Sequence, residues 1–188
     1  MTLSLQPLTP ARLDAFRALL GGRDFGGCFC AVWTAFGPDW GARCADPGQP
    51  NFAETARRVA AGEHVGYLVE DDGELVAWTG AGPKPGFPAL ADRLGARLTP
   101  LDPRVWSVGC LALSAAWRGQ GNAARVVAAV IERARAEGAT AVEAYPTLPW
   151  DEPRSYRGAH STFARLGFAE AGREADGESA IVLMRLEL

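Results

Sequence analysis

The sequence has no hydrophobic run long enough to cross a membrane and no excess of positive charge. No apolar stretch approaches the ~20 residues that span a bilayer, and the first seven residues lack the charged and apolar regions of a signal peptide. The formal net charge is −3 and the pI is about 5.5, so we expect no basic surface for nucleic acid. We therefore expect a cytoplasmic protein that binds neither nucleic acid nor a membrane.

Cysteine and histidine are also scarce, with four and two copies. Cys28 and Cys30 are spaced like half of a zinc site, but only Cys44 and the scattered His64 and His160 remain to complete it. The pattern favours packing thiols in a reducing compartment over a metal centre. Internal repeats and low-complexity tracts are missing as well, so a repeat architecture is not expected.

What is present is the composition of one ordinary globular domain. The chain has 188 residues, of which 48% are apolar and 22% charged, and this is enough to bury a substantial core. We expect a single domain over residues 1–188. Two proline-rich excursions, residues 83–104 and 146–154, are predicted to belong to this domain because periodic structure resumes after each.

Hydrophobic periodicity predicts the order of the elements. The first helix is expected at 10–20, with Thr9 as its N-cap. The second is expected at 51–61, with Asn51 as N-cap and Glu54 completing a capping box. Between these helices the periodicity is too weak to assign. The later elements are predicted as strands at 64–69 and 74–79 joined by an Asp-Gly turn at 70–73, a short helix at 89–94, a strand at 105–113, a helix from 123 to Gly138, a strand at 140–145, a helix at 155–166 and a strand at 179–188.

A glycine loop separates the strand at 105–113 from the long helix. It reads Arg118-Gly-Gln-Gly-Asn-Ala123. Gly119 and Gly121 lack side chains where backbone amides must come close to phosphate, and the helix behind them offers unpaired N–H groups with a partial positive end. The segment therefore predicts a pyrophosphate cradle, with Arg118 as a supporting charge.

Two motifs carry a resemblance to a known family. Residues 118–123 fit the Arg/Gln-x-x-Gly-x-Gly/Ala signature of the GCN5-related N-acetyltransferase (GNAT) family, and residues 163–168, which end in Gly-Phe, look like that family's late helix. The order of elements agrees over nearly the whole chain. The resemblance implies an α/β fold with a mixed, mostly antiparallel central sheet flanked by helices, and acetyl-CoA as a co-substrate.

The same resemblance implies a set of cofactor-binding residues. In the family the strand before the loop splays from its neighbour, so that its backbone binds the pantetheine arm and polarises the acetyl carbonyl. Phe163 stands where many relatives have a tyrosine acid, so it is expected to contact the cofactor without supplying a proton. The remaining implied cofactor contacts are Leu111, Ala112, Leu113, Arg118, Gly119, Gln120, Gly121, Asn122 and Ala123.

The proton chemistry departs from the family's pattern. Many members carry an acid in the strand before the loop, but residues 108–113 contain none. An alkyl amine with a pKa near ~10.4 is mostly protonated at neutral pH, so a base matters more than an acid. Glu143 is the first candidate for the base and His160 the second; an ion-paired or solvated strand residue is the alternative for Glu143. Tyr145 and Tyr156 are candidates for the acid, with packing aromatics as the alternative.

The sequence therefore predicts an acetyl-CoA-dependent N-acetyltransferase. It would transfer an acyl group to a primary amine of a small molecule or peptide by direct attack in a ternary complex. An exposed final strand would make a homodimer easy to form. The acceptor is expected beside the N-terminal half, near six aromatic residues: Trp33, Phe36, Trp40, Trp78, Phe87 and Trp150.

Two alternatives stay open. A non-catalytic acyl-CoA-binding module would also suit a chain without the strand acid and the tyrosine. A dinucleotide-binding protein is suggested because Gly119-x-Gly121-x-x-Ala124 fits that fingerprint, with Glu143 as a ribose-binding acid. Against the second alternative, residues 114–118 separate the strand from the glycines.

Overall fold

The computed structural model describes residues 3–22, 25–94, 100–150 and 155–188. The strands are β1 (Leu3–Pro7), β2 (Tyr67–Asp71), β3 (Glu74–Pro83), β4 (Val105–Leu113), β5 (Ala141–Ala144), β6 (Thr147–Leu148), β7 (Ala169–Asp176) and β8 (Ser179–Glu187). They form one sheet in the order β1-β2-β3-β4-β5-β8-β6, with β7 paired to β8. Among the described strands, β4 and β5 form the one parallel pair. The predicted mixed, mostly antiparallel sheet is confirmed.

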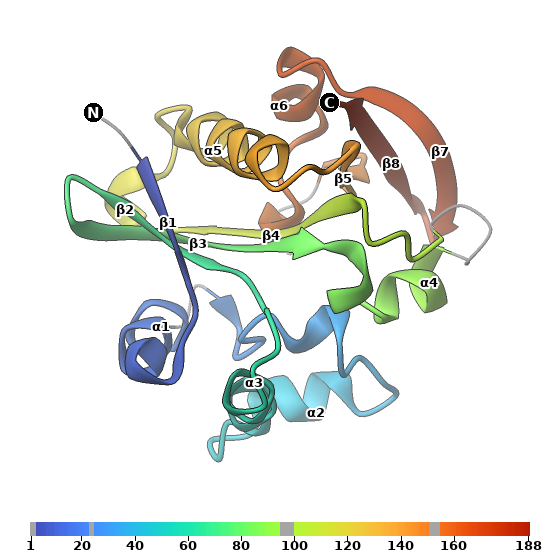
Figure 1. Cartoon of the computed structure of the whole chain (residues 1–188). Coiled ribbons are helices and arrows are strands. Elements are labelled where there is room, and N and C mark those ends of the chain that lie inside the picture. The colour runs from blue at the N-terminus through green and yellow to red at the C-terminus, as the bar shows by residue number, and fades with distance from the viewer. Residues whose placement is uncertain (1–2, 23–24, 95–99, 151–154) are drawn as a thin grey trace.

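Helices cover both faces of this sheet (Figure 1). The α-helices are α1 (Leu13–Leu20), α2 (Trp40–Ala45), α3 (Pro50–Ala60), α4 (Ala89–Leu94), α5 (Asn122–Ala136) and α6 (His160–Arg165). The 3-10 turns are η1 (Pro10–Arg12), η3 (Ala31–Trp33), η4 (Lys84–Gly86), η5 (Ala115–Trp117) and η6 (Ser155–Arg157). Helices α5 and α6 lie on one face, and α1, α2 and α3 lie on the other. Within the described ranges, no helix has both the length and the apolar character needed to cross a membrane.

The buried apolar side chains form two clusters, one on each face of the sheet. Val126 and Val130 of α5 pack on the face that carries Trp106 and Val108 of β4. Phe16 of α1 belongs to the opposite cluster, and its ring meets the Trp78 ring edge-on at 4.6 Å between centroids. Removal of this apolar area from water is the main force that holds the helices onto the sheet.

A β-bulge in β4 decides which side chains face the N-terminal helices. Cys110 pairs with Gly80 and Val108 pairs with Ala81, so Gly109 is an extra residue in β4. In a regular strand residues 107 and 110 would point to opposite faces. The bulge places both toward the N-terminal helices, where Cys110 joins the cluster of α1.

Three strands are absent from the predicted elements. The chain starts with β1 and not with a helix, because Leu3 to Pro7 pair with β2. β7 has almost no buried residue, so its sequence has no apolar alternation to reveal it. β6 lies inside the predicted proline-rich loop and is formed by two residues that pair with β8.

The predicted capping box at the second helix is wrong. Helix α3 begins at Pro50, a residue favoured at the first helical position, so Asn51 lies inside the helix. Asn51 is fully buried; its Nδ2 donates to the Gly27 carbonyl at 3.0 Å, and its Oδ1 accepts from Arg43 Nε at 3.0 Å. The Asn51 side chain thus joins α3 to α2 and to the Gly27 segment. Glu54 forms an ion pair with Arg57 of the same helix and does not cap it.

The topology also decides two other expectations. A dinucleotide-binding fold requires a doubly wound parallel sheet, which the strand order excludes. The expected exposed final strand is wrong, because β8 pairs with β5 and β6 along one edge and with β7 along the other. Since both edges of β8 are occupied, it offers no free edge for a dimer.

Candidate active site

The site begins where β4 separates from β5. Their parallel pairing ends at Val108 and Ala144, and residues 109–113 have no partner on β5. This is the separation that the resemblance implies, and Leu111, Ala112 and Leu113 all lie within it. The β5-facing edge of β4 is therefore free of strand pairing at the residues predicted to contact the thioester arm.

The turn after η6 packs closely against this free part of β4. Gly158 has a positive φ of 77°, and a Cβ at this position would lie 2.9 Å from the Phe163 ring and 3.0 Å from Leu111 Cδ1. Glycine thus lets α6 bring Phe163 beside Leu111. Phe163 is fully buried and meets the Phe168 ring edge-on at 5.4 Å. Its predicted contact with the cofactor stays a prediction.

The glycine loop has an open face in front of its backbone. Gly119 and Gly121 have φ angles of +73° and +76°, and a Cβ at either position would meet no atom within 4 Å. Gly121 is the N-cap of α5, and no side chain caps the helix there. The start of this 15-residue helix thus has no side-chain cap and has open space at the Cβ positions of both glycines, which leaves room for an anion there.

The side chains of the loop bind back to the chain just before it. Arg118 Nε donates to the Leu113 carbonyl at 3.0 Å, which joins the loop to the end of β4. Gln120 and Asn122 donate to carbonyls of η5 at 2.7 and 3.1 Å. These bonds fix the loop against η5 and the end of β4. The Arg118 guanidinium also lies over the Phe25 ring, 5.0 Å from its centroid.

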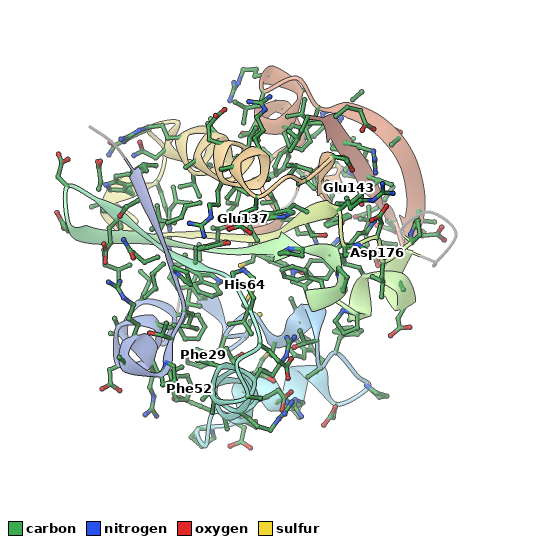
Figure 2. All side chains as sticks on the ribbon, viewed as in Figure 1. Phe29, Phe52, His64, Glu137, Glu143 and Asp176 are labelled. Atoms are coloured by element: carbon green, nitrogen blue, oxygen red, sulfur yellow. The ribbon has the colours of Figure 1, made fainter. Side chains whose placement is uncertain are left out.

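Glu143, labelled in Figure 2, lies in a buried network of charged and hydroxyl groups. Its Oε1 accepts from Arg185 at 2.8 Å, and its Oε2 accepts from Lys84 Nζ and from the Tyr145 hydroxyl, the latter at 3.2 Å. Tyr145 also bonds Ser107 Oγ at 2.8 Å. Glu143 and Lys84 are both buried. Glu143 is thus an ion-paired strand residue, which was the alternative to a catalytic base. A role of Glu143 as the base stays a prediction.

Tyr145 follows directly on the last residue of β5 that pairs with β4. Burial raises the pKa of its hydroxyl well above the ordinary value, and the charge of Glu143 adds to this effect. Tyr145 therefore keeps its proton at neutral pH, and its O–H donates a hydrogen bond to Glu143. Its ring lies 6.0 Å from that of Trp33.

Tyr156 and Arg157 extend the site toward the N-terminal half. Arg157 Nε donates to the Tyr156 hydroxyl and its Nη1 donates to Thr147 Oγ1, both at 3.2 Å. The guanidinium lies over the Trp33 ring at 5.6 Å. Trp33 Nε1 donates in turn to the Gly109 carbonyl at 2.8 Å, at the bulge where β4 leaves β5. The acid candidate Tyr156 is thus connected to β4 through Arg157 and Trp33.

Sequence reasoning missed three members of this region: Lys84, Ser107 and Arg157. Lys84 lies in the first proline-rich excursion and Arg157 in the predicted helix at 155–166, and nothing in either segment signals burial of a cation, yet both are fully buried. Ser107 reads as a small strand residue. Burial of a lysine or an arginine depends on long-range partners, so no local pattern would have found them.

The aromatic residues, cysteines and His160 that the sequence singled out differ in burial and do not form one site. Trp33, Trp78 and Phe87 are buried core residues, whereas Phe36 and Trp150 are exposed. The four cysteines are free thiols, and within the described ranges no group of three metal-ligating side chains forms. His160 is the first residue of α6 and is half-buried.

Comparison with known proteins identifies the family. A model of the acetyltransferase (GNAT) family matches residues 29–168. The chain belongs to the GNAT acetyltransferase family. A GNAT-family structure from Desulfovibrio desulfuricans superposes with a TM-score of 0.60 at 15% identity, covering 99% of both chains. The structure of AAC(6′)-Ib in a complex that includes acetyl-CoA superposes with a TM-score of 0.63 at 18% identity, covering 100% of this chain and 94% of that one.

A PaiA N-acetyltransferase from Thermoplasma acidophilum in complex with coenzyme A gives a TM-score of 0.57 at 8% identity, with full coverage of both chains. No match was found among curated proteins. At these identities the structural likeness shows the fold, and the family match carries the activity.

The GNAT protein is therefore an acyltransferase enzyme that uses acetyl-CoA as co-substrate. Its own geometry fits this ligand, because the free edge of β4 leads through η5 into the open cradle at Gly119 and Gly121. The non-catalytic alternative is set aside by the family assignment.

Proposed function

We propose that this enzyme transfers the acetyl group of acetyl-CoA to a primary amine of a small molecule or peptide, by direct attack in a ternary complex. The observation that carries the proposal is the continuity of two features on residues 109–123. The free edge of β4 leads through η5 into an open, uncapped glycine cradle. An anchor for a pyrophosphate and a surface for a thioester arm thus lie on one segment.

We further propose that residues 1–188 form a single N-acetyltransferase domain in the cytoplasm. Solved GNAT structures that align over 99–100% of the chain support a single domain. Four free thiols suit a reducing compartment.

The donor would be held by backbone groups and an apolar surface. The amides of Gly119 to Ala123 would bind the pyrophosphate, since they lie at the positive end of α5 and the Cβ positions of both glycines there are open. Leu111 and Phe163 would flank the arm where β4 has no β5 partner. When bound, acetyl-CoA supplies a thioester carbonyl that an amine can attack. A backbone N–H of the free β4 edge that polarises this carbonyl would contribute ~10²–10³ in rate.

Tyr156 is our candidate for the proton donor to the leaving thiolate. Its oxygen accepts a hydrogen bond from Arg157, so its own O–H is available to another acceptor. η6 and the following Gly158 lie beside the free part of β4. A thiolate with a pKa near ~8.5 needs modest assistance, so one hydroxyl suffices.

Glu143 is better placed to position Tyr145 than to accept a proton. Both of its carboxylate oxygens accept hydrogen bonds from cations, and the second also accepts from Tyr145. To act as a base it would have to release one of these bonds. We propose that it fixes the Tyr145 hydroxyl beside Ser107, and that the attacking species is the neutral fraction of the amine, which grows with pH.

Turnover with a panel of amines tests the proposal. The purified enzyme is mixed with acetyl-CoA and alkyl amines, amino acids, peptides or aminoglycosides, and the release of free CoA thiol is compared with the amount of acetylated amine. We expect equal amounts of both, and initial-rate lines that intersect when the two substrates are varied. Binding of acetyl-CoA without any acetylated product would refute the activity. Parallel lines would refute direct attack, because they indicate a covalent acetyl-enzyme.

A further inference from the structure

Among the residues that the structure describes, Arg157 is a buried arginine without an acidic partner. It is 1% exposed, and its hydrogen bonds go to two neutral hydroxyls, those of Tyr156 and Thr147. Its guanidinium lies over the rings of Trp33 and Tyr156, 5.6 Å from each centroid. Across the part of the chain that the structure describes, no carboxylate forms an ion pair with it. Because arginine stays protonated in proteins, this buried charge has no neutralising carboxylate among the described residues.

The other buried cations of the described chain differ in this respect. Lys84 pairs with Glu143, and Arg58 pairs with Glu63 at 2.7 Å. Glu143 is already shared between Lys84 and Arg185. Aromatic rings and hydroxyls offset part of the cost of burying a cation, but an opposite charge offsets far more. The surroundings of Arg157 therefore favour an anionic ligand.

The position of Arg157 shows which ligand this would be. Trp33, which lies under the guanidinium, bonds the Gly109 carbonyl at the point where β4 leaves β5. On the other side, Gly158 follows directly and lies against Leu111, which is predicted to contact the thioester arm. An anion at Arg157 would thus lie between the N-terminal half and the free edge of β4. This is where the acceptor must approach the thioester.

We propose that Arg157 binds a carboxylate of the acceptor, so that the preferred substrate carries both a primary amine and a carboxylate, as amino acids do. The proposal rests on the proposed function and names its substrate class. The planar guanidinium matches a carboxylate in shape and in hydrogen-bonding geometry. The same positive charge disfavours a polycation such as the kanamycin bound in one AAC(6′)-Ib structure.

Matched pairs of acceptors test this with the unaltered enzyme. Each of several amino acids is compared with its carboxamide, which keeps the amine and the side chain and removes the negative charge. We expect kcat/KM to be about 30-fold or more higher for the acid, the effect of leaving a buried charge unpaired. Equal use of acid and amide, or a preference for kanamycin, would overturn the proposal.

A second comparison separates two sources of the carboxylate. Acetyl-CoA is replaced with succinyl-CoA, which carries the carboxylate on the acyl group. We expect acetyl-CoA to remain the better donor for amino acids. If succinyl-CoA with a plain alkyl amine becomes the best pair, the carboxylate belongs to the donor and the assignment to the acceptor is wrong.

Variants assign the effect to this residue. Arg157→Gln should reduce the acid-to-amide ratio to within about threefold while leaving acetyl-CoA affinity unchanged, and Arg157→Lys should keep an intermediate ratio. Arg58→Gln is the control, because it removes another buried arginine that lies outside the proposed site. An unchanged ratio in Arg157→Gln would overturn the assignment.

Binding without turnover distinguishes failure of this inference from failure of the proposed function. N-acetyl amino acids and their amides are titrated into the CoA-bound enzyme by calorimetry. Binding of the acids with no acetylation of any amine would refute the proposed function and support the carboxylate site. Acetylation of amines without a preference for acids, or no binding of the acids, would overturn the carboxylate site.

Discussion

Glu143 holds two cations of very different exposure. The side chain of Lys84 is 1% exposed, whereas that of Arg185 is 31% exposed and also bonds Glu187 at 2.6 Å. A neutral residue at 143 would leave Lys84 charged in the interior, but Arg185 would still reach water and a second acid. The stability of this region therefore depends on Glu143 mainly through Lys84.

Glu143→Gln should lower the free energy of unfolding by about 3 kcal/mol, because it leaves a buried lysine without an opposite charge. Glu187→Gln removes a carboxylate from the same Arg185, but that carboxylate is 71% exposed, so the loss should stay below about 1 kcal/mol. Urea denaturation of both variants measures the difference, and similar losses would contradict the assigned burial.

The same Glu143→Gln protein tests its catalytic role. If Glu143 positions Tyr145, kcat falls while the pH–rate profile keeps its shape, with kcat/KM rising as the amine deprotonates. Loss of one limb of the profile would instead identify Glu143 as the base.

Single residues differ in how far the sequence predicts them. The glycines at 119 and 121 were predictable because their left-handed backbone is a local requirement, and no other atom need be known. The partners of Glu143 were not predictable. Lys84 lies 59 residues before it and Arg185 lies 42 residues after it, so the fold alone brings them together.

At the scale of elements, η3 supports the bulge of β4. Trp33 of η3 donates to the Gly109 carbonyl, and a Cβ at Gly109 would lie 2.6 Å from that indole nitrogen. The bulge and the tryptophan thus fit one another closely. Because β4 has no β5 partner from Gly109 on, this contact holds the strand at the point where the site begins.

Trp33→Phe should cost about 1–3 kcal/mol more in unfolding free energy than Trp78→Phe, because it leaves the buried Gly109 carbonyl without its donor. Both tryptophans are fully buried, but in the described structure the Trp78 indole N–H has no hydrogen-bond partner. Both variants lose the same part of the indole ring, so the difference between their unfolding free energies reports the hydrogen bond to Gly109. Equal costs by urea denaturation would show that the bond to Gly109 adds nothing.

Elements with their own periodicity were predicted well. The hairpin of β2 and β3 and the apolar stripe of α5 follow from turn chemistry and from helical spacing. β7 was missed because its residues are exposed and its conformation depends on pairing with β8. β1 was missed because five residues ending in proline carry little strand signal until β2 lies beside them.

At the scale of the whole molecule, His64 makes stability depend on pH. Burial lowers the pKa of its imidazole, although the hydrogen bond between Nε2 and the Ala81 carbonyl, 2.7 Å long, opposes this shift. The unfolded chain therefore takes up this proton at a higher pH than the folded protein. Stability is fully present above the ordinary histidine pKa of ~6.5 and is lost as the pH falls toward the folded pKa.

We expect the urea midpoint to be lower at about pH 5.5 than at about pH 7.5. His64→Gln should largely remove the difference, whereas His160→Gln, which changes the second of the chain's two histidines, should keep it. The same pH dependence in His64→Gln would show that the buried imidazole is not its source.

Calorimetric titration with acetyl-CoA tests the glycine cradle most directly. Gly121→Asp places a carboxylate in the cradle, and Gly138→Asp places the same residue beyond the other end of α5, at the same φ of +76° and with the same open space. The backbone strain of the two variants is matched, so a difference in acetyl-CoA binding between them reports the position of the carboxylate relative to the cradle. We predict binding near about micromolar for the unaltered protein and for Gly138→Asp, and none for Gly121→Asp. Retained binding in Gly121→Asp, or equal loss in both variants, would contradict a pyrophosphate site at the start of α5.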